Sequence, residues 1–127
     1  MSEKEKLEME FILNTSPRLL FNYLATPSGL SEWFADDVNP ENGYFSFSWN
    51  GAAETAKLLK KHDEKCIRFQ WESDAGTDFY WEFAIELDEL TKDISLIVTD
   101  FAARDEIEES RLFWQNRIEE LKQIIGH

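Results

Sequence analysis

Alternating hydrophobic and polar residues predict one strand near the start of the chain and five more after residue 43. Over 6–13, Leu7, Met9, Phe11 and Leu13 alternate with mostly polar neighbours, which indicates a strand with one apolar face. Residues 39–43 (NPENG) are expected to form a turn that leads into the later strands. Short connections between consecutive strands favour an antiparallel sheet. The later strands are predicted at 44–49, 54–62, 66–72, 79–88 and 94–101.

Between the first strand and the others, the hydrophobic period changes to that of a helix. Ser16 and Thr26 are good N-cap residues, and each is followed by a proline, which fits the first helical position. Two short helices are therefore predicted, over 15–25 and 26–34, joined tightly at Thr26. The second helix carries an apolar stripe at the spacing i, i+3, i+4. That stripe consists of Leu30, Trp33 and Phe34.

The end of the chain predicts one long helix over 105–125. Acidic residues are concentrated at its start, and Lys122 lies near its end. This distribution of charge is stabilised by the helix dipole. One face is apolar at steps of four and three residues, with Arg111 as the single charged exception. The stripe is Ile107, Arg111, Trp114, Ile118, Leu121 and Ile125.

The order of these elements predicts an α+β fold. Each strand has one strongly apolar face, and the long helix is the element available to cover it. We therefore expect a curved antiparallel sheet wrapped around the long C-terminal helix, with two short helices after the first strand. The length of 127 residues suits one domain spanning 1–127.

Composition and charge narrow the set of partners. The net charge of −13 would repel nucleic acid and anionic membrane surfaces, so neither is expected as a partner. No segment approaches the roughly 18 apolar residues of a membrane span, and no signal peptide is recognisable at the start. With a single cysteine, Cys66, the chain cannot form an internal disulfide. A cytoplasmic location is expected, and no membrane insertion.

Motifs for catalysis or metal binding do not stand out. His62 lies in a lysine-rich turn and His127 is the last residue, so neither is placed as a general base beside a serine. Asp36 and Asp37 could bind a cation together with Glu41, but the loop lacks the ligand spacing that calcium requires. A solvated turn at the end of a buried helix is the better interpretation. We therefore expect no catalytic residue, no metal and no cofactor.

Several stretches, in this order, resemble the START-like superfamily, also called the Bet v allergen-like, SRPBCC or helix-grip superfamily. The closest group is similar to the homologues of the heat-shock-chaperone ATPase activator. "SPRLLFNYLATPSGLSEWF" resembles that group's helix pair, and "NGYFSFSW" its Gly-x-Phe-x-Phe strand. "EKCIRFQW" resembles a later strand, although the prolines that precede it in the group are missing here. "IVTDF" and "FWQNRIEELKQII" fit the last strand and the C-terminal helix.

The resemblance implies a helix-grip fold with a cavity between the sheet and the C-terminal helix. Members of the superfamily bind lipids, sterols, polyketides and other apolar molecules there. The parity of the strand residues and the stripe of the helix predict which side chains face this space. The predicted lining is Trp33, Phe34, Phe47, Trp49, Phe69, Trp81, Phe83, Arg111, Trp114 and Ile118. These aromatic side chains either fill the interior or line a pocket, and the sequence leaves both open.

The resulting hypothesis is a binding module for a small hydrophobic or amphipathic ligand, without enzymatic activity. Arg111 would anchor a ligand acid at the mouth, or else would pair with Glu108 or Asp100 as a structural residue. Two alternatives remain at this point. One is a chaperone cofactor or other protein-interaction module, including a homodimer. The other is a polyketide cyclase-like or hydrolase-like enzyme, for which Arg111 with Asp100 or Tyr80 would supply the polar groups.

Overall fold

One antiparallel sheet of seven strands forms the framework in the computed structural model, which describes residues 3–125. The strand order is β1-β7-β6-β5-β4-β3-β2, so the first strand pairs with the last and the others follow one another. The prediction of an antiparallel sheet is therefore confirmed. The strands are β1 (Lys4–Leu13), β2 (Asp37–Glu41), β3 (Tyr44–Trp49), β4 (Ala52–His62), β5 (Cys66–Trp71), β6 (Trp81–Leu87) and β7 (Ile94–Ala103).

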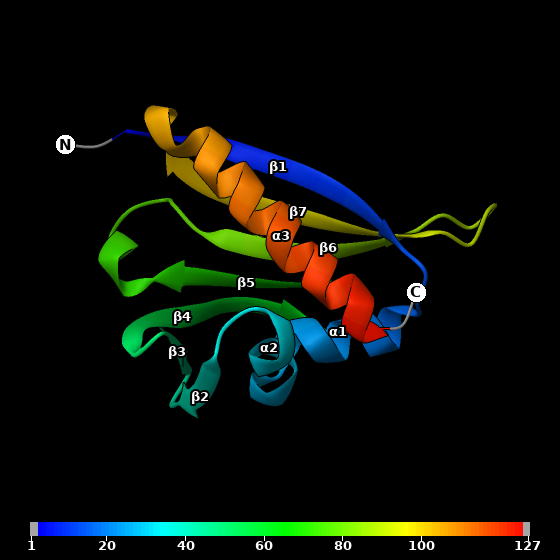
Figure 1. Ribbon diagram of the computed structural model, residues 1–127, viewed down its shortest axis with the longest axis horizontal. Helices are drawn as coiled ribbons and strands as arrows, with labels where there is room; N and C mark the ends of the chain where they lie inside the picture. Colours follow the sequence, from blue (N-terminus) through cyan, green and yellow to red (C-terminus); the bar gives the residue numbers. More distant parts are fainter. Residues whose placement is uncertain (1–2, 126–127) are drawn as a thin grey trace.

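Within residues 3–125, three α-helices accompany the sheet. The longest, α3 (Ile107–Ile125), follows a short 3-10 turn at Arg104–Glu106 and crosses one face of the sheet diagonally (Figure 1). The short helices α1 (Pro17–Ala25) and α2 (Pro27–Trp33) lie near the C-terminal end of α3 (Figure 1). A second 3-10 turn, Glu72–Asp74, opens the connection from β5 to β6. This arrangement confirms the predicted α+β fold, with a curved sheet around the long helix.

The caps of the two short helices form as the sequence predicts. The hydroxyl of Ser16 accepts a hydrogen bond from the backbone N–H of Leu19 at 3.2 Å. The hydroxyl of Thr26 accepts one from the backbone N–H of Gly29 at 2.9 Å. Each bond satisfies one of the donors that a helix N-terminus leaves unpaired. Thr26 thus ends α1 and begins α2 without any linker between them.

The expectation of a turn over residues 39–43 is wrong for most of that segment. Residues Asp37–Glu41 form the edge strand β2, which pairs with β3. Pro40 is tolerated because an edge strand has one side without ladder partners, where a missing N–H costs nothing. Only Asn42 and Gly43 form the turn, with φ angles of 43° and 84°, which favour glycine and asparagine.

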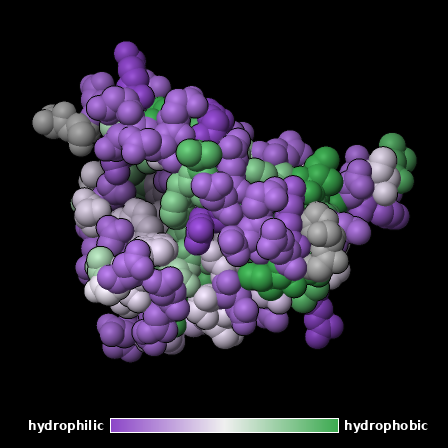
Figure 2. All heavy atoms as spheres, viewed as in Figure 1, coloured by the Kyte–Doolittle hydropathy of each residue, from purple (hydrophilic) through white to green (hydrophobic). Residues whose placement is uncertain are grey.

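Helix α3 and the aromatic strand residues share one core. The side chains of Trp114, Ile118 and Leu121 are buried on α3, as the predicted stripe requires. None of the helices within residues 3–125 is both long and apolar enough to cross a membrane. Most of the face in Figure 2 is hydrophilic, and apolar side chains appear in smaller patches.

Candidate ligand-binding site between the sheet and α3

The fold brings the predicted lining residues other than Arg111 together in one core. Trp49 and Arg111 are half-buried, and the others have at most 3% of their surface exposed. The buried members are Trp33, Phe34, Phe47, Phe69, Trp81, Phe83, Trp114 and Ile118.

These aromatic rings pack against one another at close range. Phe34 lies at the centre, with ring centroids of Trp81 at 5.2 Å and Trp114 at 5.6 Å. Phe69 and Trp81 stack across β5 and β6 with centroids 4.4 Å apart. Such distances are typical of direct aromatic contact. The rings therefore occupy much of the space in which a helix-grip cavity would lie, and their role as a pocket lining stays a prediction.

The indole N–H groups of this cluster differ in their hydrogen-bond acceptors. Trp33 and Trp49 donate to the backbone carbonyls of Tyr23 and Phe34, both at 2.8 Å, which pins α2 to α1 and to β3. Trp114 donates to a carboxylate instead. Nε1 of Trp81 is buried and has no acceptor within residues 3–125. Because buried donors are nearly always paired, this atom is an exception within the core.

A surface hollow opens beside the N-terminal half of α3, next to the aromatic cluster. It has a volume of about 390 Å³ and lies between β7, the turn before α3 and α3 itself. Figure 2 shows a recess on this side of α3. We refer to this feature as the hollow. Its lining residues are Asp100, Glu106, Glu109, Ser110, Phe113 and Trp114.

Of the residues that line the hollow, the predicted lining contains Trp114 alone. Asp100 is the omitted residue that the sequence pattern could have identified. On β7 the side chains of Leu96, Val98 and Ala102 point to the buried face, and alternation puts Asp100 in the same row. The signal was present in the sequence, because a single acid interrupts an otherwise apolar face of "ISLIVTDFAA". From the sequence alone, Asp100 is expected only as a partner for Arg111.

The carboxylate of Asp100 is held by two neutral donors. Nε1 of Trp114 donates to Oδ2 at 2.9 Å, and the backbone N–H of Phe101 donates to Oδ1 at 2.8 Å. Burial raises the pKa of Asp100 above its ordinary value, although these two hydrogen bonds and the charge of Lys4 oppose the shift. Asp100 is thus a half-buried acid whose charged form is only partly compensated.

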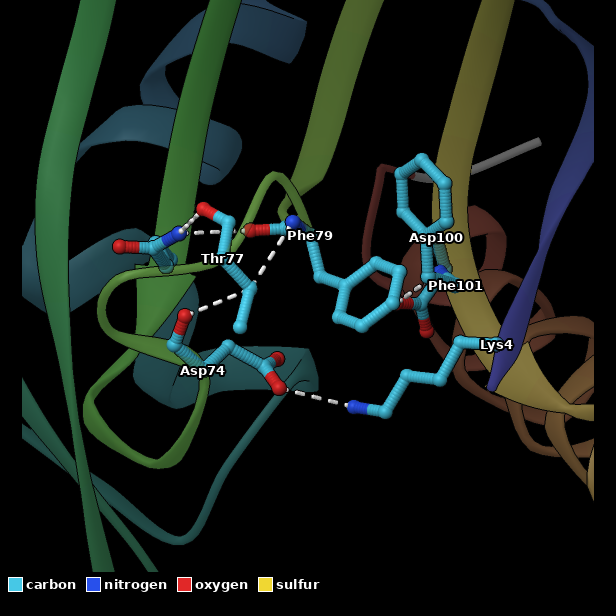
Figure 3. A network of polar contacts seen from close by, with 7 residues as sticks. Lys4, Asp74, Thr77, Phe79, Asp100 and Phe101 are labelled. Carbon is cyan, nitrogen blue, oxygen red and sulfur yellow. Dashed lines mark hydrogen bonds and ion pairs between the residues drawn. The ribbon is translucent and has the colours of Figure 1, made fainter. Parts of the chain in front are cut away.

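The cation whose charge acts on Asp100 is already engaged elsewhere. Nζ of Lys4 forms an ion pair with Oδ1 of Asp74 at 2.9 Å and lies 5.3 Å from the centre of the Phe79 ring. Figure 3 shows Lys4 reaching from β1 to Asp74 in the β5–β6 connection, with the carboxylate of Asp100 nearby on β7. The ion pair thus links β1 to the β5–β6 connection at the end of the sheet on which the hollow lies.

Arg111 does not belong to the residues that line the hollow. It is half-buried on α3 and forms no ion pair within residues 3–125, either with Glu108 or with Asp100. The charged residues around the hollow are acids. The prediction that Arg111 anchors a ligand acid is untested.

One of the two aspartates that come after Phe34 has a structural role. Oδ2 of Asp36 accepts a hydrogen bond from the backbone N–H of Asn50 at 2.8 Å, which braces the turn between β3 and β4. Asp37 is exposed on β2. Within the described chain, no group of three or more His, Cys, Asp and Glu side chains is arranged to hold a metal ion. His127 lies outside the described residues.

Replacement of Asp100 by Asn should change how stability depends on pH. The pKa of Asp100 in the folded state lies above the ordinary value of 3.8. The wild-type protein therefore loses stability as the pH rises from 3.8 through the folded-state pKa, because the buried carboxyl group becomes charged. The variant has no charge to bury. The unfolding free energy of the Asp100→Asn variant, minus that of the wild type, should therefore increase with pH in this window.

Urea unfolding of both proteins at a series of pH values measures this difference. The rest of the chain is identical in the two proteins, so the difference isolates the contribution of residue 100. A difference that stays level or decreases with pH would contradict a raised pKa.

Comparison with known proteins identifies the family of this chain. The model of the START-like superfamily domain matches residues 1–127. The solution structure of BfR322 from Bacteroides fragilis is 32% identical, covers 100% of this chain and 94% of its own, and superposes with a TM-score of 0.69.

More distant structures share the fold. The Aha1 dimer from Colwellia psychrerythraea is 18% identical over 95% of this chain and 96% of its own, with a TM-score of 0.80. MLL2253 from Mesorhizobium loti is 18% identical over 94% of this chain and 95% of its own, with a TM-score of 0.75. Among curated proteins, none matches. Because the family model spans the whole chain and the sheet, the two short helices and α3 have the expected order, the chain belongs to the START-like superfamily.

Proposed function

We propose that this protein binds a small amphipathic ligand in the hollow between β7 and α3, without a chemical reaction. The hollow itself is the observation that carries this proposal. Its volume of about 390 Å³ lies within the range of about 300–1,000 Å³ that is common for ligand sites. Membership of the START-like superfamily supports a ligand-binding role on the same side of the sheet.

The lining of the hollow suits a ligand with an apolar part and a polar end. Phe113 has 40% of its surface exposed, and its ring contacts those of Trp114 and Phe34 at 5.3 and 6.4 Å. An apolar group placed here would extend the aromatic cluster toward the surface and would remove Phe113 from water. The polar end would meet Asp100 and Ser110.

Filling the hollow should abolish binding without unfolding the protein. Ser110 is half-buried on α3 and lines the hollow, so Ser110→Phe should occupy the space of the ligand. Gln115→Phe is the matched control, because it adds the same ring at an exposed position of the same helix that is not part of the lining. We expect at least a tenfold weaker affinity, equal to about 1.4 kcal/mol, for Ser110→Phe alone.

Isothermal titration calorimetry with octanol, octanoate, octylammonium, a sterol and an aromatic polyketide would measure this effect. Saturable binding of one probe by the wild type and by Gln115→Phe, but not by Ser110→Phe, supports the proposal. Equal binding by Ser110→Phe would place the ligand elsewhere. Failure of every probe to bind the wild type would remove the proposed function.

A second candidate function is that of a protein-interaction module. Leu112 and Phe113 are neighbours on α3 and have 57% and 40% of their surfaces exposed, so this helix offers apolar surface to a protein partner. If no probe binds while sedimentation shows concentration-dependent self-association, this second candidate would replace the first.

A further inference from the structure

The first strand of the chain forms one free edge of the sheet. β1 pairs with β7 on one side only, and it lies at the margin of the sheet in Figure 1. Along its other side, alternate backbone N–H and C=O groups have no ladder partner within residues 3–125. Such a row of unpaired groups is a template for a further strand. This edge has ten residues, compared with five in β2 at the opposite edge.

The two edges of the sheet differ in how well they are protected. β2 is short and contains Pro40, and both features discourage the addition of a strand. β1 contains neither proline nor glycine, and its register with β7 runs from Lys4 to Leu13 without a bulge. A regular edge of this length is open to another strand unless its side chains oppose the approach. The charges on β1 therefore decide which strand can pair with it.

The outer face of β1 carries its charges in a self-complementary order. Leu7 points into the core, so alternation puts two lysines and then two glutamates on the opposite face, at Lys4, Lys6, Glu8 and Glu10. In an antiparallel pair of β1 strands centred on Leu7, Lys6 lies opposite Glu8 of the second copy. Lys4 likewise lies opposite Glu10. A pair centred on Lys6 or on Glu8 would instead place that residue opposite its own copy, which is unfavourable.

The central pair, Lys6 with Glu8, is available for this contact. Both side chains are exposed, and neither forms an ion pair within residues 3–125. Lys4 already pairs with Asp74, so its contact with Glu10 is expected to contribute less. All four charges of the self-complementary face point away from the core, so the packing of α3 against the sheet leaves them uncovered.

We propose that two copies of this chain associate through antiparallel pairing of their β1 strands, centred on Leu7, which joins two seven-stranded sheets into one. The arrangement has two-fold symmetry, so each ion pair occurs twice. Backbone hydrogen bonds supply attraction, and the order of the charges sets the register. The net charge of −13 on each copy opposes association, and the opposite charges at the edge offset part of that repulsion. This inference is independent of the ligand proposed for the hollow.

Charge reversal at the central pair tests this interface. Lys6→Glu and Glu8→Lys each replace two attractive contacts by two repulsive ones, so each alone should weaken dimerisation by about tenfold or more. Lys6→Glu makes the net charge more negative and Glu8→Lys makes it less negative, so repulsion between whole molecules would affect the two variants in opposite directions. The double variant Lys6→Glu/Glu8→Lys keeps the net charge and restores opposite charges, so it should dimerise like the wild type. Sedimentation equilibrium over a concentration series measures each dissociation constant.

A mixture of the two single variants provides a second test. In a mixed pair, the two glutamates of the Lys6→Glu chain lie opposite the two lysines of the Glu8→Lys chain. A heterodimer should therefore form between two variants that associate poorly with themselves. Native mass spectrometry of the mixture distinguishes the heterodimer from both homodimers by mass. Absence of the heterodimer would overturn the proposed register.

Leu112→Ser is the control on α3, because it removes an apolar side chain with 57% of its surface exposed and leaves β1 unchanged. It should dimerise like the wild type. Association that is lost in Leu112→Ser but retained in Lys6→Glu and Glu8→Lys would place the interface on α3 and overturn the inference. A double variant that stays as weak as the single ones would overturn it too. So would a wild-type protein that remains monomeric up to about 1 mM, a concentration at which even weak pairs associate.

Discussion

Replacement of Gly29 by Ala should reduce the free energy of unfolding by about 3 kcal/mol, the upper part of the usual range for overpacking. A Cβ atom built on Gly29 would lie 2.2 Å from the backbone oxygen of Asn22 and 2.7 Å from Cα of Tyr23. Both obstacles are backbone atoms of α1, so a side-chain rotation cannot relieve them. The two short helices would have to separate, although Thr26 joins them directly.

The sign of the effect is informative, because helix propensity alone predicts the opposite. An exposed Gly→Ala change inside a helix gains up to about 1 kcal/mol. Ser28→Ala is the matched control, since it places Ala at an exposed position of the same helix and should change stability by less than about 0.5 kcal/mol. Urea unfolding of both variants measures the difference. A neutral or stabilising Gly29→Ala would show that α1 and α2 are not in this close contact.

Local signals in the sequence were sufficient for most of the fold. Ser16 and Thr26 each combine an N-cap with a following proline, and both caps form. Strand alternation placed Phe47, Phe69 and Phe83 on the face that is buried. These features depend on neighbours in the chain, so periodicity alone reveals them.

The predictions that failed concern features that depend on partners distant in the chain. Strand β2 contains Asn39 and Pro40, which favour turns, and it forms because β3 offers its free edge. The role of Asp100 likewise required the position of Trp114, which approaches it only when α3 crosses the sheet. Arg111 is the charged exception in the helix stripe, but it does not line the hollow, whereas the acid that interrupts the apolar face of β7 does.

Aromatic residues could be assigned to the interior but not to a function. The same alternation is expected whether Phe34 and Trp81 fill a core or line a cavity. Their mutual contacts at 5.2 Å favour a filled core, and the hollow beside α3 then becomes the remaining space for a ligand. The distinction depends on whether the side chains fill the space between the sheet and α3. The pattern of residues along the chain does not contain this information.

Phe34→Ala tests that distinction and should cost about 3–5 kcal/mol, the usual range for removing a buried phenylalanine ring. Phe34 has 1% of its surface exposed, and its ring contacts those of Phe47, Trp49 and Trp114 at 5.3, 5.4 and 5.6 Å. In a filled core, the deleted ring leaves a cavity and removes all of these contacts. If the rings instead lined an open pocket, the loss should be near 1 kcal/mol.

Phe113→Ala is the control for Phe34→Ala, because it deletes the same ring at a position with 40% of its surface exposed. Urea unfolding should show a clearly smaller loss for it. The new cavity in Phe34→Ala offers a second measurement, since a dry apolar cavity of this kind can bind benzene. Benzene should therefore stabilise Phe34→Ala and leave the wild type unchanged. Similar losses in the two variants, with no effect of benzene, would mean that the aromatic cluster is not the filled core on which the assignment of the hollow depends.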